Sequence, residues 1–203
     1  MRSDTKTEIL ELLCQKVRVM SAEQIAREFF GDSEHSKTKA LNLVRGLETQ
    51  GYVTTKRVSV RQIESAGAPL FAWEPGQSDL PNFRAIAAAN RRRWNGELHP
   101  TTVVFPTEKA NRRFGSGKLR VVRRQELEHD LLAANVYFSL ALEEKRNWAN
   151  EDALEKSAFG NRRPDAVLFR GGVSVIEVAG RSYSAEKLEA IFTHFKAYSL
   201  RFH

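Results

Sequence analysis

The stretch RRPDAVLFRGGVSVIEVAG, from Arg162 to Gly180, carries the residue types best suited to chemistry. Two short apolar runs flank a Gly-Gly pair, which predicts a β-hairpin, and each run carries one acid, Asp165 and Glu177. Carboxylate oxygens on adjacent strands are the ligands that a hard divalent cation such as Mg²⁺ takes. An acid inside VSVIEV also needs a partner, because a buried carboxylate must be paired, protonated or metal-bound. The sequence therefore predicts a candidate metal site at this hairpin.

Two helices are expected to position the hairpin. QELEHDLLAANVYFSLALEE begins at Gln125 and has helical periodicity, and SAEKLEAIFTHFKAYSLRF predicts the last helix of the chain. A helix, a β-hairpin and a helix on one sheet indicate an α/β layer structure. Their expected inward residues are Leu127, Leu131, Ala134, Val136 and Phe138 in the first helix, and Leu188, Ile191, Phe192, Phe195 and Leu200 in the second.

The N-terminal third predicts three helices followed by a β-hairpin. TKTEILELLCQKV is amphipathic, Ser21 and Gln24 form a capping box before AEQIAREFF, and a third helix runs from about Ser36 to Gln50 and ends at Gly51. The β-rich runs YVTTKRVSVRQI and PLFAWEP, separated by SAGA, predict the hairpin. This order is typical of a winged helix-turn-helix, whose third helix enters the major groove. The expected outward positions of the third helix are Ser36, Lys37, Lys39, Asn42, Arg45 and Thr49, and those of the wing are Lys56, Arg57 and Arg61.

Charge is distributed unevenly along the 203 residues, whose formal net charge is +7. Residues 1–80 hold 11 Lys or Arg and 11 Asp or Glu, whereas residues 81–125 hold 11 and 2. The excess lies in the clusters Arg91, Arg92 and Arg93, Arg112 and Arg113, and Lys118 to Arg124. A solvated basic surface is one interpretation, but self-repulsion of this size favours a polyanionic partner such as DNA.

The chain is expected to hold one to two domains. Pro75, Gly76, Ser78 and Pro81 predict a boundary, which gives a winged helix over residues 1–78, a basic extension of the second domain over 79–124, and an α/β core over 125–203. Cys14 is the single cysteine, and no run approaches the roughly 18 apolar residues of a membrane span. We therefore expect a cytoplasmic protein without a membrane partner.

The order of helix, PD-bearing strand and Glu-bearing strand resembles the core of the PD-(D/E)xK nuclease superfamily. That resemblance implies a restriction-endonuclease-like domain in which Glu128, Asp165 and Glu177 bind Mg²⁺ and a lysine assists the attacking water. The motif lysine is expected two residues after Glu177, where this chain has Ala179. Lys187, in the helix that follows, is the candidate for a relocated lysine, and a surface charge paired with Glu186 or Glu189 is the alternative.

A second resemblance covers most of the chain. QIAREFF, LNLVRGLETQGYV, EHDLLAANVYFSL, RPDAVL and IEVAGRSYSAEKLEAIFTHFKAY together resemble the replication-relaxation family of plasmid and mobile-element proteins. The resemblance implies a winged helix joined to a nuclease-like domain. It marks Glu128 or His129, Asp165, Glu177, Lys187 and Tyr198 as the family-like positions. The second strand of that family usually carries another acid two residues after its Glu. In this chain that position is Ala179.

Other chemistry has weaker support from the sequence. RFGSGK lacks the first glycine and the final Ser or Thr of a phosphate-binding loop. His129 stands alone beside Glu128, which is more typical of a hydrogen-bonded residue than of a ligand, and Tyr183 lacks the histidine–metal site of a strand-transfer enzyme.

The sequence thus predicts an α+β protein with an N-terminal winged helix and a nuclease-like domain. It favours a DNA-binding protein of a plasmid or mobile element, acting in replication, mobilisation or transcriptional control, whose nuclease-like domain is degenerate and non-catalytic. The alternative is an active Mg²⁺-dependent endonuclease that uses Lys187. Winged helices commonly dimerise, so a homodimer on double-stranded DNA is expected, and a protein-binding assembly role stays open.

Overall fold

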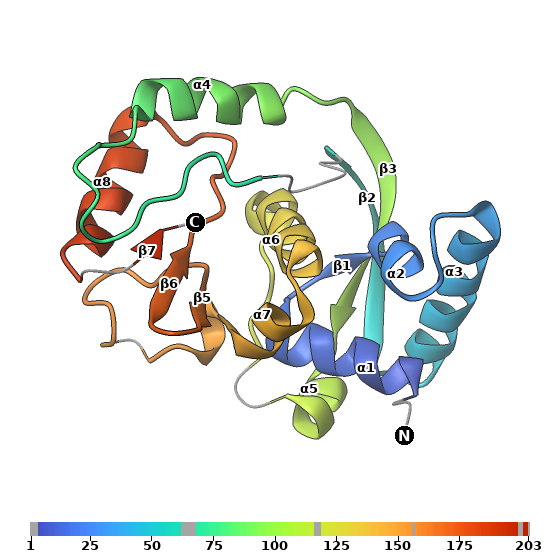
Figure 1. Cartoon of the computed structure of the whole chain (residues 1–203). Coiled ribbons are helices and arrows are strands. Elements are labelled where there is room, and N and C mark those ends of the chain that lie inside the picture. Colours follow the sequence, from blue (N-terminus) through green and yellow to red (C-terminus); the bar gives the residue numbers. More distant parts are fainter. Residues whose placement is uncertain (1–3, 62–67, 116–118, 156, 199–200, 203) are drawn as a thin grey trace. The chain divides into compact units, whose positions relative to one another are not determined.

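The structure, a computed structural model, describes residues 4–61, 68–115, 119–155, 157–198 and 201–202. The chain folds into two compact units, and each is built from two separate segments. Unit 1 comprises Met1–Gln62 and Glu97–Phe138, and unit 2 comprises Ile63–Gly96 and Ser139–His203. Both units combine helices with one small sheet, so the protein is a mixed α+β protein (Figure 1).

Unit 1 is organised around a three-stranded antiparallel sheet of order β1-β3-β2. The short β1 (Met20–Ser21) pairs with β3 (Leu98–Pro106), and β3 pairs with β2 (Val53–Arg61) along the full nine residues of each strand. Figure 1 shows β2 and β3 as two long strands side by side. The pairing runs from Val53 opposite Pro106 to Arg61 opposite Leu98, so β2 and β3 form one long hairpin.

Three helices precede this hairpin, as the sequence predicts. α1 (Thr5–Glu11) continues into the π-helical turn η1 (Leu12–Lys16), and α2 (Ala22–Phe29) follows β1. The predicted capping box of α2 is confirmed: the backbone amide of Gln24 donates to Ser21 Oγ at 3.0 Å, and Gln24 Oε1 accepts from the Ser21 amide at 2.8 Å. α3 (Glu34–Thr49) has Gln50 as its C-cap. The next residue, Gly51, has a positive φ of 73°, a conformation that suits glycine.

The predicted partner of β2 is wrong. PLFAWEP was expected to pair with β2, but β2 pairs with β3, which lies beyond a long intervening segment. Phe71 and Trp73 of PLFAWEP instead pack in unit 2, against Phe192 among others. A local hairpin has the lower loop-closure cost, but burial of these aromatic rings favours the non-local pairing. The expected SAGA turn falls largely on residues outside the described ranges.

Unit 1 is completed by α5 (Glu108–Phe114), the 3₁₀ turn η2 (Arg124–Glu126) and α6 (Leu127–Ser139). Leu127 and Leu131 of α6 pack with Val19, Val60 and Val103 of the first sheet and its flank. The side-chain amide of Gln24 donates to the Leu131 carbonyl at 2.8 Å, which ties α2 to α6.

The division of the chain therefore differs from the predicted ranges 1–78, 79–124 and 125–203. Residues 97–124 fall in unit 1 because β3 belongs to the first sheet, and α6 falls there because its apolar face packs on that sheet. Residues 63–78 fall in unit 2, with Phe71 and Trp73 in its core. Periodicity predicts the helix at 127–139 correctly but not the sheet that it covers.

Unit 2 has a four-stranded sheet of order β4-β5-β6-β7. The predicted hairpin is confirmed: β5 (Ala166–Phe169) and β6 (Val173–Ile176) are antiparallel around Gly171 and Gly172, which both have positive φ. β4 (Trp148–Asn150) extends the sheet on one side, and β7 (Arg201–Phe202) joins β6 in parallel on the other.

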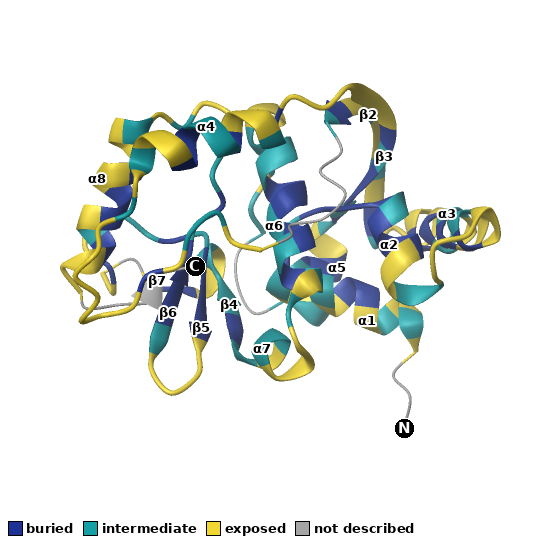
Figure 2. Cartoon of the chain, turned by 45° about the horizontal axis from the view of Figure 1, so that its top comes forward, coloured by how far each residue is buried: buried dark blue, intermediate teal, exposed yellow. Residues whose placement is uncertain are grey.

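Helices and a 3₁₀ turn complete unit 2: α4 (Phe83–Arg93), α7 (Leu142–Asn147), η3 (Glu151–Ala153) and α8 (Ala185–Lys196). The predicted inward residues of α8 are buried, except that Leu200 lies outside the described ranges. Figure 2 shows the strands β5 and β6 buried and their connecting turn exposed. Every helix in the described ranges is too short or too polar to cross a membrane.

Candidate functional site

The outer face of α3 presents polar and basic side chains to solvent. Lys39, Asn42 and Arg45 are exposed, as predicted. Lys37 is half-buried and its ammonium lies 2.6 Å from Glu34 Oε1, and this hydrogen bond raises the pKa of Lys37. The prediction for Ser36 is wrong: its side chain is buried, because Ser36 Oγ donates to the Phe30 carbonyl at 2.9 Å. The available face of α3 is therefore narrower than the sequence predicts.

The hairpin strand β2 carries the three predicted wing cations. Lys56 and Arg57 are exposed, with Lys56 Nζ 5.8 Å from the centroid of the Phe105 ring. Arg61 is engaged within the fold: its amide donates to Glu128 Oε1 at 2.8 Å, and its guanidinium lies 3.5 Å from the same oxygen. Lys56 and Arg57 are thus better placed to meet a phosphate than Arg61.

A basic and aromatic cluster joins α5 to the start of β2. Lys109 Nζ donates to the Gln50 carbonyl at 2.7 Å and lies 4.5 Å from the centroid of the Tyr52 ring. Arg112 and Arg113 are both exposed, and Arg113 donates to Tyr52 Oη at 2.8 Å. Of the predicted pair, Arg113 therefore helps to hold α5 in place. Lys109 and Tyr52 were not predicted, although the N-cap Thr107 marks the helix that presents Lys109.

The third basic cluster ends α4 in unit 2. Arg91 and Arg92 are exposed, whereas Arg93 is half-buried and its pKa is lowered by burial. Trp94, the next residue, is only 2% exposed, and its indole N–H donates to the Ala179 carbonyl at 3.0 Å. The sequence predicts the arginines but not this anchor, which fixes the end of the helix that carries them.

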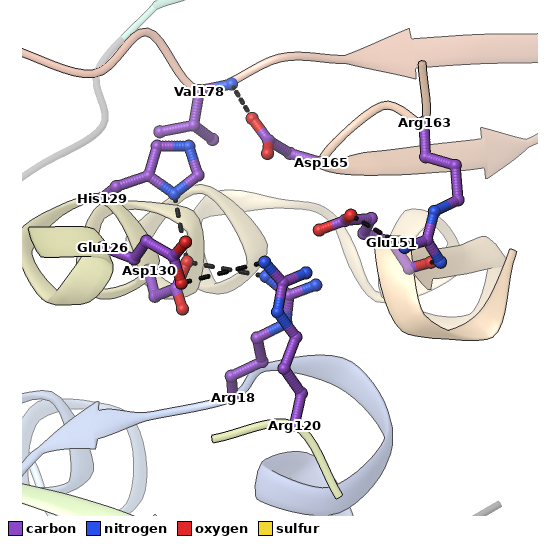
Figure 3. A network of polar contacts seen from close by, with 9 residues as sticks. All are labelled: Arg18, Arg120, Glu126, His129, Asp130, Glu151, Arg163, Asp165 and Val178. Atoms are coloured by element: carbon purple, nitrogen blue, oxygen red, sulfur yellow. Dashed lines mark hydrogen bonds and ion pairs between the residues drawn. The ribbon is translucent and has the colours of Figure 1, made fainter. Parts of the chain in front are cut away.

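The two acids of the hairpin in unit 2 flank the last pair of its ladder. Asp165 directly precedes Ala166 and Glu177 directly follows Ile176, and Ala166 pairs with Ile176. Asp165 Oδ2 accepts a hydrogen bond from the Val178 amide at 2.7 Å (Figure 3). Both acids are half-buried. That these two carboxylates meet at one end of the hairpin stays a prediction.

Lys187 of α8 and Tyr183 lie close to these acids. Lys187 Nζ is 3.6 Å from the centroid of the Tyr183 ring. Burial and the charge of Arg162 lower the pKa of Lys187, while Glu177 and Asp165 act in the opposite direction. Burial raises the pKa of the Tyr183 phenol, and the two acids raise it further. Unit 2 thus combines two carboxylates, an ammonium and a protonated phenol, and the sequence did not predict Tyr183 or Arg162 as members.

Ala179 occupies its position for a structural reason. It packs with Ile86 and Ala87 of α4 and with Leu188 of α8. Its carbonyl accepts from Trp94, and the next carbonyl, of Gly180, accepts from the Asn90 side chain at 3.0 Å. A lysine at 179 would have to bring its ammonium into this apolar contact, which is costly without a partner.

The remaining predicted positions are described within their own units. Glu128 belongs to unit 1, where it binds Arg61. Its neighbour His129 has Nδ1 3.1 Å from Asp130 Oδ1, and Arg18 lies 3.7 Å from the same oxygen (Figure 3). In unit 2, the ring of Tyr198 contacts Phe159 and His194.

The described residues contain no group of three or more His, Cys, Asp or Glu side chains able to hold a metal ion. The carboxylates predicted for Mg²⁺ in unit 2 are those of Asp165 and Glu177. This donor set suits Mg²⁺ only where water and phosphate oxygens complete the octahedron.

Comparison with family models, curated proteins and solved structures gave no match to this chain.

Proposed function

We propose that the protein binds double-stranded DNA through unit 1, which acts as a winged helix. The observation that carries this proposal is the order of elements α1, β1, α2, α3, β2 and β3 combined with the sheet order β1-β3-β2. In a winged helix the third helix and the hairpin that follows it form the DNA-binding face. Here those elements are α3 and β2–β3.

The charges on this face support the same function. Lys39 and Arg45 are exposed on α3, and Lys56 and Arg57 are exposed on β2. Asn42 lies between the two cations of α3, and its amide is suited to pairing with the edge of an adenine in the major groove. We assign base reading to Asn42 and Arg45 and phosphate contacts to Lys37, Lys39, Lys56 and Arg57.

Unit 2 is proposed to be a degenerate nuclease-like domain without catalytic activity. The motif-lysine position is Ala179, which packs against α4, and Asp165 holds the Val178 amide. The protein would then serve replication, mobilisation or transcriptional control of a plasmid or mobile element. It would act in the cytoplasm as a homodimer, since paired winged helices read two half-sites of one duplex.

A gel-shift titration of a 30-base-pair duplex at rising salt tests this proposal. Binding should weaken steeply, because each neutralised phosphate contributes a slope of about −0.9 in log K against log salt. Binding that is absent, or that is insensitive to salt, would refute DNA recognition by this face.

An active Mg²⁺-dependent endonuclease is the second candidate, favoured by the location of Lys187 near Asp165 and Glu177. In that case the two carboxylates would hold the ion, which would activate water and stabilise the scissile phosphate. The Lys187 ammonium would stabilise the developing charge.

Supercoiled plasmid incubated with Mg²⁺ or Mn²⁺ distinguishes the two candidates. The degenerate domain predicts equal background nicking by the wild type, Asp165→Ala and Lys187→Met proteins. Metal-dependent nicking that both substitutions abolish would establish the endonuclease instead.

A further inference from the structure

One edge of the sheet in unit 1 carries backbone amides that the β2–β3 hairpin does not use. In the order β1-β3-β2, strand β2 lies at the outer edge of the sheet and pairs with β3 alone. Along an antiparallel pair, the backbone groups of successive residues point alternately toward the partner strand and away from it. About half of the amides of β2 therefore face away from β3.

Two glutamates identify these outward-facing amides. The Thr55 amide donates to Glu48 Oε1 at 2.8 Å, and the Arg61 amide donates to Glu128 Oε1 at 2.8 Å. Thr55 and Arg61 are an even number of residues apart, so every second residue between them points its backbone groups outward as well. These intervening residues are Arg57 and Ser59.

The prolines of β3 agree with this assignment. Pro106 lies opposite Val53, and Pro100 lies opposite Ser59. Proline has no amide to donate, so it fits a strand only where the ladder lacks a hydrogen bond. Val53 and Ser59 therefore belong to the set whose backbone groups point away from β3.

The outward amides of Arg57 and Ser59 form what we call the edge gap, which lies between Glu48 and Glu128. Both residues are exposed, and in the described part of the chain their amides meet no side-chain or loop acceptor. Amides two residues apart on a strand are separated by about 6.8 Å. An extended peptide supplies carbonyl oxygens at this spacing when it adds to a sheet edge. The edge gap therefore fits a short added strand.

The charges beside the edge gap determine which strand fits. Lys56 and Arg57 are exposed, and as neighbours on a strand they project from opposite faces of the sheet. A second copy of β2 would bring the same two cations against them, which is repulsive. A peptide with carboxylates near its centre neutralises them instead. Its ends must be uncharged, because Glu48 and Glu128 lie at the two ends of the gap.

We propose that the edge gap binds an extended acidic peptide, which adds to the three-stranded sheet of unit 1 as a further strand on β2. The bound peptide covers Lys56 and Arg57, the residues assigned above to DNA phosphates. Peptide and duplex therefore compete for β2, and this regulatory consequence rests on the proposed function. The docking itself rests only on the geometry of unit 1.

Fluorescence anisotropy of the full-length protein with a labelled peptide of alternating Val and Glu, blocked at both ends, tests the docking. Ser59→Pro removes one outward amide and leaves the β2–β3 ladder intact, and its ring obstructs an added strand. It should weaken peptide binding by roughly tenfold. Ser59→Ala keeps the amide and is the matched control, which should bind as the wild type does.

A second pair of variants tests the charge of the edge gap. Arg57→Gln should weaken peptide binding by about threefold, as expected for loss of an exposed ion pair. Arg45→Gln removes an equal charge from an exposed position of α3 and should bind the peptide as the wild type does. This pair also decides the outcome if circular dichroism shows that Ser59→Pro disturbs the fold.

Wild-type affinity in a folded Ser59→Pro protein, or equal losses in Arg57→Gln and Arg45→Gln, would overturn the docking. Equal binding of a Val–Lys peptide would overturn it too, as would a dimer in sedimentation that Ser59→Pro dissociates, since a second copy would then occupy the edge. A labelled duplex run in parallel separates the two proposals. Peptide binding without duplex binding rejects the proposed function and keeps the docking, and a duplex that the peptide does not displace rejects the competition.

Discussion

In unit 1 the cations of α3 lie on an exposed face, whereas in unit 2 the expected metal ligand Asp165 is hydrogen-bonded within the fold. Lys39 and Arg45 are exposed. Asp165, in contrast, accepts the Val178 amide, and Ala179 packs against α4 and α8. A surface that binds a polyanion needs only charge at the right positions, while a catalytic site needs polar groups that the interior must tolerate. The two units therefore differ in how easily each function survives changes in sequence.

Removing the anchor of α4 should give the largest effect on stability. Trp94→Ala is expected to lower the free energy of unfolding by about 3–5 kcal/mol, because it leaves a large cavity in unit 2. Trp94→Phe keeps most of the volume and loses the hydrogen bond to the Ala179 carbonyl, at about 1 kcal/mol. Chemical denaturation followed by circular dichroism measures both. If both variants lost only a small and similar amount of unfolding free energy, the packing of Trp94 would not be what holds the end of α4.

Reversing the charge of α3 should abolish most DNA binding without affecting the fold. Lys39→Glu/Arg45→Glu is expected to weaken binding by on the order of 100-fold, because two attractions to phosphate become repulsions. Fluorescence anisotropy with a labelled duplex measures the affinity. Asp165→Asn/Glu177→Gln, a matched double change in unit 2, should bind within about twofold of the wild type. Equal losses in both variants would remove the contrast between the units.

The sequence predicts those parts of both units that depend on neighbouring residues. The helices at 22–29 and 34–49 follow from caps and periodicity, and the hairpin around Gly171 and Gly172 follows from its turn. The pairing of β2 with β3 was missed, because two apolar runs compete for β2 and the nearer one has the lower closure cost. The packing of Phe71 and Trp73 in the core of unit 2 favours the pairing of β2 with β3.

The candidate site residues were likewise predicted only where their positions depend on neighbouring residues. The pairing of Ala166 with Ile176, the neighbours of Asp165 and Glu177, follows from the hairpin. Glu128 is carried by a helix that packs on the sheet of unit 1, which periodicity cannot indicate. Ser36 satisfies the helical spacing of an outward residue, yet its hydroxyl binds the Phe30 carbonyl. Side-chain hydrogen bonds of this kind depend on loop geometry that no local pattern specifies.

Removing the carboxylate of Asp165 should destabilise unit 2 by an intermediate amount. Asp165→Ala leaves the Val178 amide without its acceptor, which costs about 1.5–3 kcal/mol for a bond to a charged group. Asp165→Asn retains an acceptor oxygen and should lose less. Thermal unfolding monitored at pH 7 compares the two. A stability equal to that of the wild type in Asp165→Ala would mean that the carboxylate serves function and not structure, and would favour the endonuclease.

The smallest effect is expected at Lys187, and it sharpens the comparison most directly. Lys187→Met removes a cation from the Tyr183 ring, worth about 0.5–1 kcal/mol at an exposed site, and also removes an ammonium that burial disfavours. Because the pKa of Lys187 is lowered on folding, the unfolded chain holds this proton more tightly.

The contribution of Lys187 to the free energy of unfolding must then rise with pH between its lowered pKa and the ordinary pKa of about 10.4. Above the ordinary pKa this contribution is constant. Denaturation curves of the wild type and Lys187→Met at pH 7 and pH 10 should therefore show the wild type gaining relative to the variant. The opposite trend would mean that Asp165 and Glu177 hold the ammonium more strongly than burial disfavours it, as a catalytic lysine beside two metal-binding acids would require.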